Sequence, residues 1–174
     1  MILPDINLLL FAHHPQAPQH KRAQQWWDRC LAGDESVGLA WVVILGFIRI
    51  STNPKLHQNP LTPDEASSRV REWLALPHFH LVEPAPGHFD RLATRLNQLG
   101  SAGNLTTDIH LATLASERGY ILHTTDADFA RFTGLKWVNP LNDSEWINSM
   151  ADNPARSASP ERLAFRKKFQ KRHQ

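Results

Sequence analysis

The chain has little of what disulfide-bonded, zinc-binding or membrane-spanning proteins need. Its 174 residues include one cysteine, Cys30, so no internal disulfide can form. No Cys/His spacing typical of a zinc site is present. The longest apolar runs fall far short of the ~18 residues that a membrane-spanning helix requires. These absences favour a soluble globular protein of a reducing compartment, and the length favours one domain.

Secretion signals and phosphate-binding loops are also missing. The opening stretch MILPDINLLLFAHH carries an acid where a signal peptide would carry positive charge. We therefore interpret its beginning as the first strand of the fold and expect the protein to be cytoplasmic, without a membrane contact. No P-loop or other glycine-rich cradle is present. This absence argues against a different metal-dependent phosphohydrolase on a doubly wound sheet.

Positive charge is concentrated at the C-terminal end. Residues 154–174 hold seven Lys/Arg and one acid, which leaves 12 basic and 16 acidic residues in the rest of the chain. Such asymmetry often marks a nucleic-acid contact. The hydrophobic pattern thins from about Asn142, so residues 142–174 are expected to be a mobile basic extension. Three interpretations of this extension stay open: it binds RNA phosphates, it binds an acidic partner, or it has no function. The RNA-binding interpretation rests on Arg166, Lys167, Lys168, Lys171 and Arg172.

Strands and helices are expected to alternate along residues 1–141. The sequence predicts strands at 1–5, 37–40, 79–82, 120–125 and 135–138, helices at 17–32, 41–50, 62–76, 87–99 and 106–118, and a helical turn at 128–132. Thr62 and Glu65 form a capping-box pattern, and Gly119 marks a helix end. Trp26 and Trp27 are adjacent, so we expect only one of them to face inward. The alternation predicts a mostly parallel sheet with helices on both faces.

Acidic side chains follow two predicted strands and begin one helix. Asp5 ends the first strand, Asp126 and Asp128 follow the strand YILHTT, and Asp108 lies in the first turn of the preceding helix. Ligands of such sheets bind at the carboxyl ends of the strands. Clustered carboxylates repel one another, so a bound cation is their best explanation. Oxygen ligands select Mg²⁺ or Mn²⁺, which suits phosphodiester hydrolysis.

Three segments resemble, in order, motifs of the PIN-domain ribonucleases. They are the opening LPDINLLL with Asp5 and Asn7, the stretch NLTTDIHLATLA with Asp108, and the stretch TTDADFARF with Asp126 and Asp128, followed by GLKWVNPL. The match covers roughly residues 1–141. A single DxD pattern has low specificity, whereas three motifs in register are specific. Within this family the chain most resembles the VapC toxins of VapBC toxin–antitoxin pairs.

The resemblance implies a PIN-like α/β/α sandwich and a metal-dependent endoribonuclease. Asp5, Asp108 and Asp126 would hold Mg²⁺ or Mn²⁺, with Asp128 in a supporting catalytic role. Cleavage by an activated water would leave a 5′-phosphate and a 3′-hydroxyl. The family also implies a cognate antitoxin that holds the toxin inactive, and a homodimer.

Plainer interpretations of the same residues stay open. Asp5 and Asp108 are also common helix-start residues, and Asp126 and Asp128 are also common turn residues. Asn7 and Thr125 are candidates to orient the carboxylates, and either can equally satisfy local backbone groups.

Gly46 departs from the family pattern. The helix segment WVVILGFIRI matches the family at Phe47 and Arg49, but Gly46 stands where the family has a glutamate. Glycine within a helix costs about 1 kcal/mol relative to alanine, so local stability does not explain it. We hypothesise a loss-of-activity substitution, the alternative being a natural glycine with three sufficient acids.

Besides the phosphohydrolase considered above, two other functions stay open. One is a catalytically silent PIN module that binds an antitoxin or RNA without cutting, and the other is RNA processing by a PIN nuclease outside toxin–antitoxin systems.

Overall fold

The computed structural model describes residues 1–100 and 103–142 of the chain. Its centre is a parallel five-stranded sheet with the order β3-β2-β1-β4-β5. The strands are β1 (Ile2–Pro4), β2 (Val37–Ala40), β3 (Phe79–Val82), β4 (Ile121–His123) and β5 (Trp137–Val138). The strand order runs outward from β1 on one side and from β4 on the other, so it reverses between these two strands. In doubly wound sheets, ligands bind at the carboxyl ends of the strands at such a reversal.

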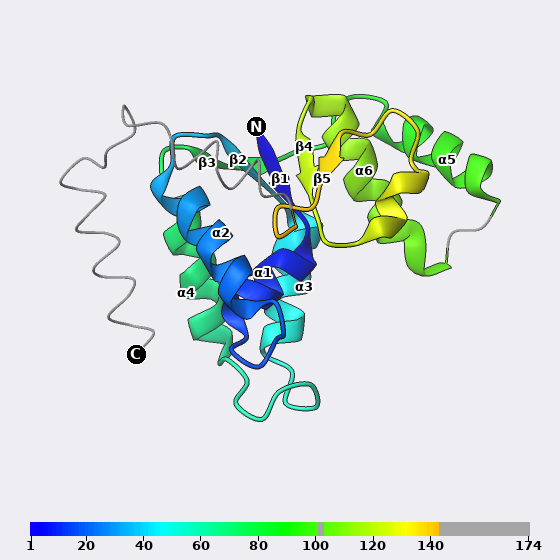
Figure 1. Ribbon diagram of the computed structural model, residues 1–174. Coiled ribbons are helices and arrows are strands. Elements are labelled where there is room, and N and C mark those ends of the chain that lie inside the picture. Colours follow the sequence, from blue (N-terminus) through cyan, green and yellow to red (C-terminus); the bar gives the residue numbers. More distant parts are fainter. Residues whose placement is uncertain (101–102, 143–174) are drawn as a thin grey trace.

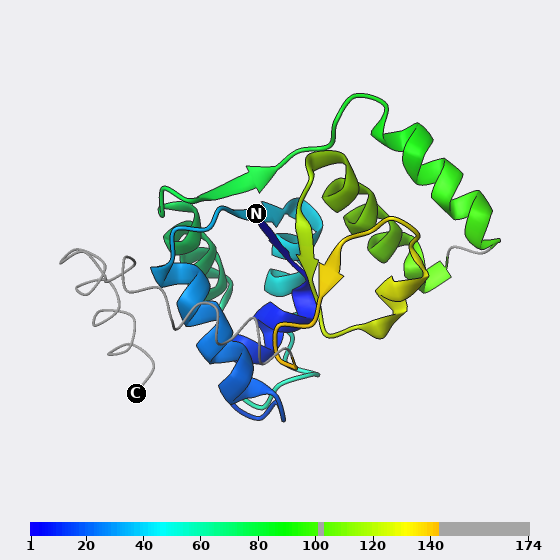
Figure 2. The ribbon, with the colours of Figure 1, turned by 45° about the horizontal axis from the view of Figure 1, so that its top comes forward.

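The helices pack around this sheet in two groups. They are α1 (Ile6–His13), α2 (His20–Ala32), α3 (Trp41–Ser51), α4 (Pro63–Leu74), α5 (His88–Leu99) and α6 (Thr106–Arg118), with 3₁₀ turns η1 (Gly103–Leu105) and η2 (Ala127–Arg131). Helices α1 to α4 lie together on one side of β1 and β4, and α5, α6 and η2 lie on the other (Figure 1). Figure 2 shows the same division from a second direction. The predicted α/β/α sandwich is therefore confirmed.

All the predicted elements are present, and their bounds differ from the predicted ones by at most three residues. Strands β2 and β3 and helix α6 begin and end where the sequence predicts. Helix α4 has the predicted capping box, in which Thr62 accepts from the N–H of Glu65 and the Glu65 side chain accepts from the N–H of Thr62. Gly119 ends α6 in the left-handed conformation, with a φ of 70°. Local capping chemistry therefore fixes these ends, as it usually does.

Helix α1 was not predicted, because its segment lacks a polar face. The stretch INLLLFAH is apolar at nearly every position. Leu8, Leu9 and Ala12 are buried, and Leu10 and Phe11 pack partly buried against the core. A helix that is apolar all round gives no 3.6-residue pattern in the sequence, and it requires burial on several sides. Helices α2 and α3 provide that cover by packing against α1.

The expectation that only one of the two adjacent tryptophans faces inward was wrong. Trp26 is 0% exposed and Trp27 is 2% exposed. The Trp26 indole N–H donates to Nδ1 of His123 in β4 at 3.2 Å. Trp27 instead packs edge-on against Trp73 of α4 and Phe79 of β3. Both are buried because α2 is covered on two sides, by β4 and by the α4–β3 unit.

The expectations about membrane contact and about the C-terminal extension are tested only for the described residues. No helix within residues 1–100 and 103–142 is long and apolar enough to cross a membrane. Residues 143–174 lie outside the described residues. The proposed extension and its candidate RNA-binding residues therefore stay predictions; these residues are Arg166, Lys167, Lys168, Lys171 and Arg172.

Candidate metal-binding carboxylate site

Asp5 lies where the strand order reverses. It directly follows β1, and its backbone N–H donates to the carbonyl of His123 in β4 at 2.9 Å. Its Oδ1 accepts from the N–H of Ile6 at 2.7 Å, which makes it the N-cap of α1. The residue is 6% exposed. The capping interpretation and the functional one are therefore compatible, because capping engages Oδ1 while the carboxylate sits at the expected ligand-binding edge.

The protonation of Asp5 reflects burial beside other acids. Burial raises the pKa of Asp5 to about 6, against the lowering effect of hydrogen bonds from Thr124 and Ile6. The negative charges of Asp108 and Asp126 raise the pKa further. A nearby cation would reverse this effect, because it stabilises the ionised form. The electrostatics thus indicate a place where positive charge is favoured.

Thr124 joins three of the polar groups of the site, a role that the sequence analysis did not assign. Its hydroxyl donates to Oδ2 of Asp5 at 2.7 Å. The hydroxyl oxygen of Thr124 also accepts from Nδ2 of Asn7 at 3.2 Å and from the N–H of Asp126 at 3.0 Å. One hydroxyl offers one donor and two lone pairs, so its hydrogen-bonding capacity is fully used. Thr124 is 0% exposed and ties β1, α1 and the Asp126 turn together.

Asn7 and Thr125, the two predicted orienting residues, are placed differently. Asn7 contacts Thr124 and so reaches Asp5 through a shared hydroxyl. Its Oδ1 is buried and has no hydrogen-bond partner in the described part of the chain. Thr124, the neighbour of Thr125, makes the contact to Asp5. Since adjacent residues of an extended chain point to opposite sides, a shift by one residue moves the hydroxyl away from the site.

Asp126 and Asp128 occupy the turn after β4. Asp126 is the N-cap of η2, and its Oδ1 accepts from the N–H of Asp128 at 2.8 Å. The Asp128 side chain is 56% exposed and pairs with Arg131 at 2.8 Å. The turn interpretation therefore holds for both residues, and Asp126 additionally connects to Thr124 through its backbone. Of the four acids, Asp128 is the most exposed to solvent.

Asp108 approaches from the opposite group of helices. It lies half-buried in the first turn of α6. Burial raises the pKa of Asp108, the charges of Asp126 and Asp128 raise it further, and Arg131 opposes them. The acids that follow β1, begin α6 and follow β4 thus lie within electrostatic range of one another.

Gly46 lies against the first residue of α1. It is buried in α3, and a Cβ at this position would lie 2.3 Å from Cδ1 of Ile6. Such a contact forces the Cδ1 end of the Ile6 side chain to move, and a rotamer change of this partly exposed residue provides the room. The close approach of α3 to α1 at this position is a contact that the helix propensity alone does not reveal. Position 46 of α3 therefore lies against Ile6, the residue that follows Asp5 in the chain.

The donor set fits a hard divalent cation. Asp5, Asp108 and Asp126 offer carboxylate oxygens, and the Oδ1 of Asn7 is a buried acceptor without a partner in the described part of the chain. Within residues 1–100 and 103–142, no three His, Cys, Asp or Glu side chains are close enough to enclose a metal. Mg²⁺ commonly keeps several waters and binds through one or two carboxylates, so a closed cage is not required.

The family model and the similar sequences match the chain to the same family of proteins. Residues 2–135 match the family model described as PIN domain. The chain is 43% identical over 143 residues to ribonuclease VapC33 of Mycobacterium tuberculosis, covering 82% of this chain and all of that protein. It is 40% identical over 140 residues to ribonuclease VapC37 of the same organism, covering 80% of this chain and 97% of that one.

Solved structures share the fold at low sequence identity. The toxin VapC20 of Mycobacterium tuberculosis, described as cleaving the sarcin–ricin loop, superimposes with a TM-score of 0.57 at 13% identity, covering 78% of this chain and 99% of that one. The VapBC2 complex of Rickettsia felis, bound to a DNA fragment from its promoter, gives 0.54 at 16% identity, covering 79% and 98%. These similarities show the fold.

Proposed function

The chain belongs to the PIN domain family, among its VapC-type toxins, and from this premise we propose that it is a metal-dependent endoribonuclease of a toxin–antitoxin pair. The ribonuclease names of VapC33 and VapC37 support the activity. The complex of Rickettsia felis VapBC2 supports an antitoxin as partner. Because RNA is the proposed substrate, we also propose a cytoplasmic location.

The observation that carries the proposal is the arrangement of acids around Asp5. Asp5, Asp108 and Asp126 would hold Mg²⁺ or Mn²⁺ at the carboxyl ends of β1 and β4. The bound ion would lower the pKa of a water molecule and would offset the negative charge that develops on the phosphate. Thr124 fixes the orientation of Asp5, and Asn7 fixes that of Thr124. Cleavage of the phosphodiester would leave a 5′-phosphate and a 3′-hydroxyl, as the family resemblance implies.

The direct test is RNA cleavage by the purified chain. We expect cleavage of cellular RNA in Mg²⁺ or Mn²⁺ and none in EDTA, with 5′-phosphate ends that an exonuclease specific for this end degrades. Addition of a cognate antitoxin is expected to stop the reaction. Cleavage that persists in EDTA would contradict the metal-dependent mechanism.

A homodimer is the second part of the proposal, and α3 offers a surface for it. Trp41 is 49% exposed and Leu45 is 59% exposed. They are four residues apart on one helix and therefore lie on the same face. Large apolar side chains that share an exposed face commonly mark a protein interface. With the family resemblance, this face favours a second copy of the chain as its partner.

We expect the Leu45→Glu variant to be monomeric. A charge in an apolar interface must be desolvated without a partner, which weakens association strongly. Light scattering coupled to size-exclusion chromatography would measure the mass. The matched control is Leu56→Glu, since Leu56 is also 59% exposed but lies in the loop after α3. A dimeric Leu45→Glu variant would exclude this face as the interface.

Gly46 is proposed to lower the activity, because position 46 supplies no carboxylate beside Asp5. Restoring the family glutamate requires room, and the Cδ1 of Ile6 occupies it. We therefore expect Gly46→Glu combined with Ile6→Val, which removes that carbon, to raise cleavage about tenfold at limiting Mn²⁺. The controls are Ile6→Val alone and the same pair with Gly46→Gln, which matches glutamate in size without its charge.

The competing function is a silent PIN module that binds its partner without cutting. Gly46 is the observation that favours it. No cleavage by the natural chain, together with cleavage by the Gly46→Glu/Ile6→Val variant, would support the silent module. Equal rates in all these variants would show that Asp5, Asp108 and Asp126 suffice and that Gly46 serves helix packing.

A further inference from the structure

A cavity separate from the carboxylates lies between α5, α6 and the segment that follows η2. Its volume is about 980 Å³. The lining comes from residues 85–86, from α5, from the second half of α6 and from residues 131–133. Asp5, Asp108 and Asp126 are not among the lining residues. None of the roles proposed above uses this cavity.

The charge of the cavity is positive. Three arginines line it, Arg91, Arg95 and Arg131, and Glu117 is the acid among the lining residues. Glu117 is 3% exposed and accepts from Arg91 Nε at 2.6 Å, from His88 Nδ1 at 2.9 Å and from the N–H of Ala85 at 3.2 Å. Its charge is therefore already compensated within the protein.

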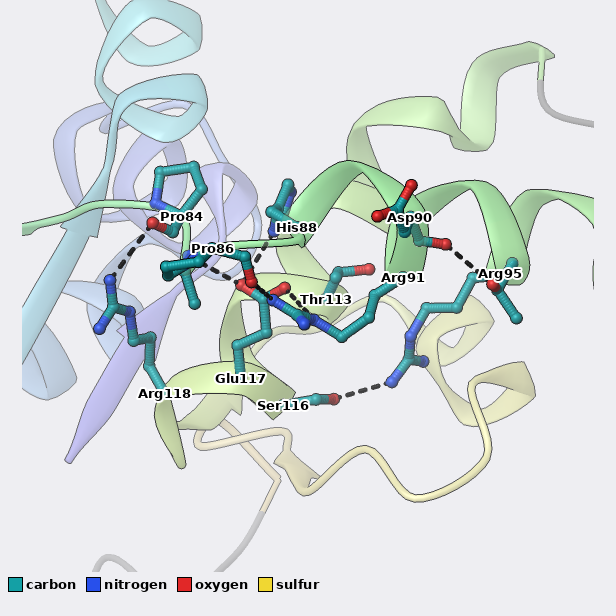
Figure 3. A network of polar contacts seen from close by, with 12 residues as sticks. Pro84, Pro86, His88, Asp90, Arg91, Arg95, Thr113, Ser116, Glu117 and Arg118 are labelled. Atoms are coloured by element: carbon teal, nitrogen blue, oxygen red, sulfur yellow. Dashed lines mark hydrogen bonds and ion pairs between the residues drawn. The ribbon is translucent and has the colours of Figure 1, made fainter.

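Although burial alone would raise the pKa of Glu117, the hydrogen bonds from His88, Arg91 and Ala85 outweigh it and the pKa is lowered. The carboxylate thus stays ionised and holds Arg91 in place. Figure 3 shows this network, in which Glu117 of α6 faces His88 and Arg91 of α5. The network fixes the two helices that form the walls of the cavity.

Arg95 differs from the other two arginines. Its Nη2 donates to Oγ of Ser116 at 2.9 Å, across from α5 to α6 (Figure 3). No carboxylate of the described residues lies within ion-pair distance of it, whereas Arg91 pairs with Glu117 and Arg131 with Asp128. A guanidinium carries five N–H donors in a planar fork that matches phosphate oxygens. Arg95 therefore presents unused donors and an uncompensated positive charge to the cavity.

Arg131 links the cavity to the turn after β4, which carries Asp126 and Asp128. This side chain lines the cavity and also pairs with Asp128 at 2.8 Å. Its charge also acts on Asp108 of the acidic site. A strand of RNA with one phosphodiester at the carboxylates would carry a nearby phosphate toward this cavity. The three arginines of the cavity suit the sugar–phosphate backbone, whose charge contributes much of the affinity of nucleic-acid complexes.

We propose that the α5–α6 cavity binds a backbone phosphate of the RNA substrate outside the carboxylate site, with Arg95 as its principal contact. The proposal rests on the nuclease function proposed above. Arg95 is a binding residue in this assignment, and it contributes by positioning the strand rather than by chemistry. Contacts to phosphate position a nucleic acid without reading its sequence, so the effect is expected for any single-stranded RNA.

The test is RNA binding at several salt concentrations. A labelled single-stranded RNA pool of random sequence is titrated with the full chain in EDTA, and fluorescence anisotropy gives the dissociation constant. We expect Arg95→Ala to weaken binding about tenfold at low salt, because a charge-assisted hydrogen bond to a phosphate is lost. The slope of log affinity against log salt is expected to fall in magnitude by about 0.7, the value for one lost phosphate contact on a single strand.

Two variants sharpen the measurement. Arg71→Ala is the matched control, because Arg71 also donates to a single serine, Ser68 at 3.3 Å, but lies on α4 in the other helix group. It is expected to keep the natural affinity and slope. Arg95→Lys keeps the charge without the planar fork, so its slope is expected to stay natural while its affinity falls partly.

The proposal is overturned if Arg95→Ala keeps the natural salt slope, or if the natural chain binds no RNA. It is also overturned if Arg95→Ala loses only antitoxin binding, because the cavity then accepts an acidic protein segment. Cleavage assays in Mn²⁺ separate the two proposals. If the natural chain cuts RNA and Arg95→Ala matches it in binding, only the cavity assignment fails. If the natural chain binds RNA through Arg95 but never cuts, the nuclease proposal fails and the cavity assignment stands.

Discussion

Replacing Asp5 by asparagine is expected to lower metal-dependent RNA cleavage about 10³-fold while the chain stays folded. The loss corresponds to about 4 kcal/mol of transition-state stabilisation, in the range that a bound divalent ion supplies. Asparagine keeps an oxygen that can accept from the N–H of Ile6, so the cap of α1 survives. It removes the negative charge that would hold the cation. Gel-based cleavage rates in Mn²⁺, with circular dichroism to check folding, measure both expectations.

The same variant gives a second readout that does not depend on catalysis. Mn²⁺ is expected to raise the melting temperature of the natural chain at pH 7.5, because a ligand that binds only the folded state stabilises it. The pKa of Asp5 is about 6, so at pH 5 most of these carboxyls carry a proton that competes with the metal. The shift should therefore shrink as the pH falls from 7.5 to 5. In Asp5→Asn it should be small at both pH values.

A matched control separates the site from general charge effects. Asp64 also lies in the first turn of a helix, α4, but it is exposed. Helix α4 leads into β3, which is separated from β1 by β2. Asp64→Asn should cleave RNA and respond to Mn²⁺ as the natural chain does. If Asp5→Asn cleaves at the natural rate, Asp5 is only a helix cap, and the plainer interpretation of this residue is correct.

The acids were predictable from the sequence because their positions follow from strand ends. Asp5 and Asp126 come directly after segments that read as strands, and the carboxyl ends of neighbouring parallel strands meet at one edge. Asp108 was placed by the helix that begins two residues earlier, whose bounds were predicted correctly. The sequence therefore predicts which acids lie at the carboxyl edge of the sheet, because this placement depends on the direction of the strands and not on side-chain contacts.

What was not predictable depends on contacts between distant segments. The stretch of α1 is apolar on all sides, so only the cover provided by α2 and α3 shows why it is a helix. In the same way, the close contact that a side chain at position 46 would make is with Ile6 of another helix. Helix propensity is a local property, and tertiary packing overrides it. A single sequence gives no signal for such a contact.

Arg131 and Arg95 have different roles because of their partners. Arg131 is neutralised by Asp128, and its charge moderates the acids of the site. Arg95 has only a serine, so its charge remains available to a ligand. A substrate that is itself a chain of negative charges needs both arrangements, since an acidic site alone would repel it. The proposed cation and the proposed phosphate cavity therefore complement each other electrostatically.

Thr124→Val is expected to lower cleavage about 10- to 100-fold and to destabilise the fold by about 2–4 kcal/mol. Valine has nearly the same shape but lacks the hydroxyl that serves Asp5, Asn7 and Asp126. Each buried group left unpaired costs about 1–3 kcal/mol, and groups that orient a metal ligand typically contribute 10- to 100-fold to activity. Denaturant unfolding and cleavage rates at several Mn²⁺ concentrations would measure the two effects.

The pH dependence separates orientation of Asp5 from a loss of stability alone. The hydrogen bond from Thr124 lowers the pKa of Asp5, so removing it moves that pKa above about 6. Ionised Asp5 is then populated only at higher pH, and the rising limb of the cleavage profile should shift upward in Thr124→Val. Thr124→Ser keeps the hydroxyl and should keep the natural profile, even if the lost methyl group lowers stability. Thr125→Val should leave the profile unchanged, because the hydroxyl that contacts Asp5 belongs to Thr124. A natural profile in Thr124→Val would mean that this residue supports only the packing between β4 and α1.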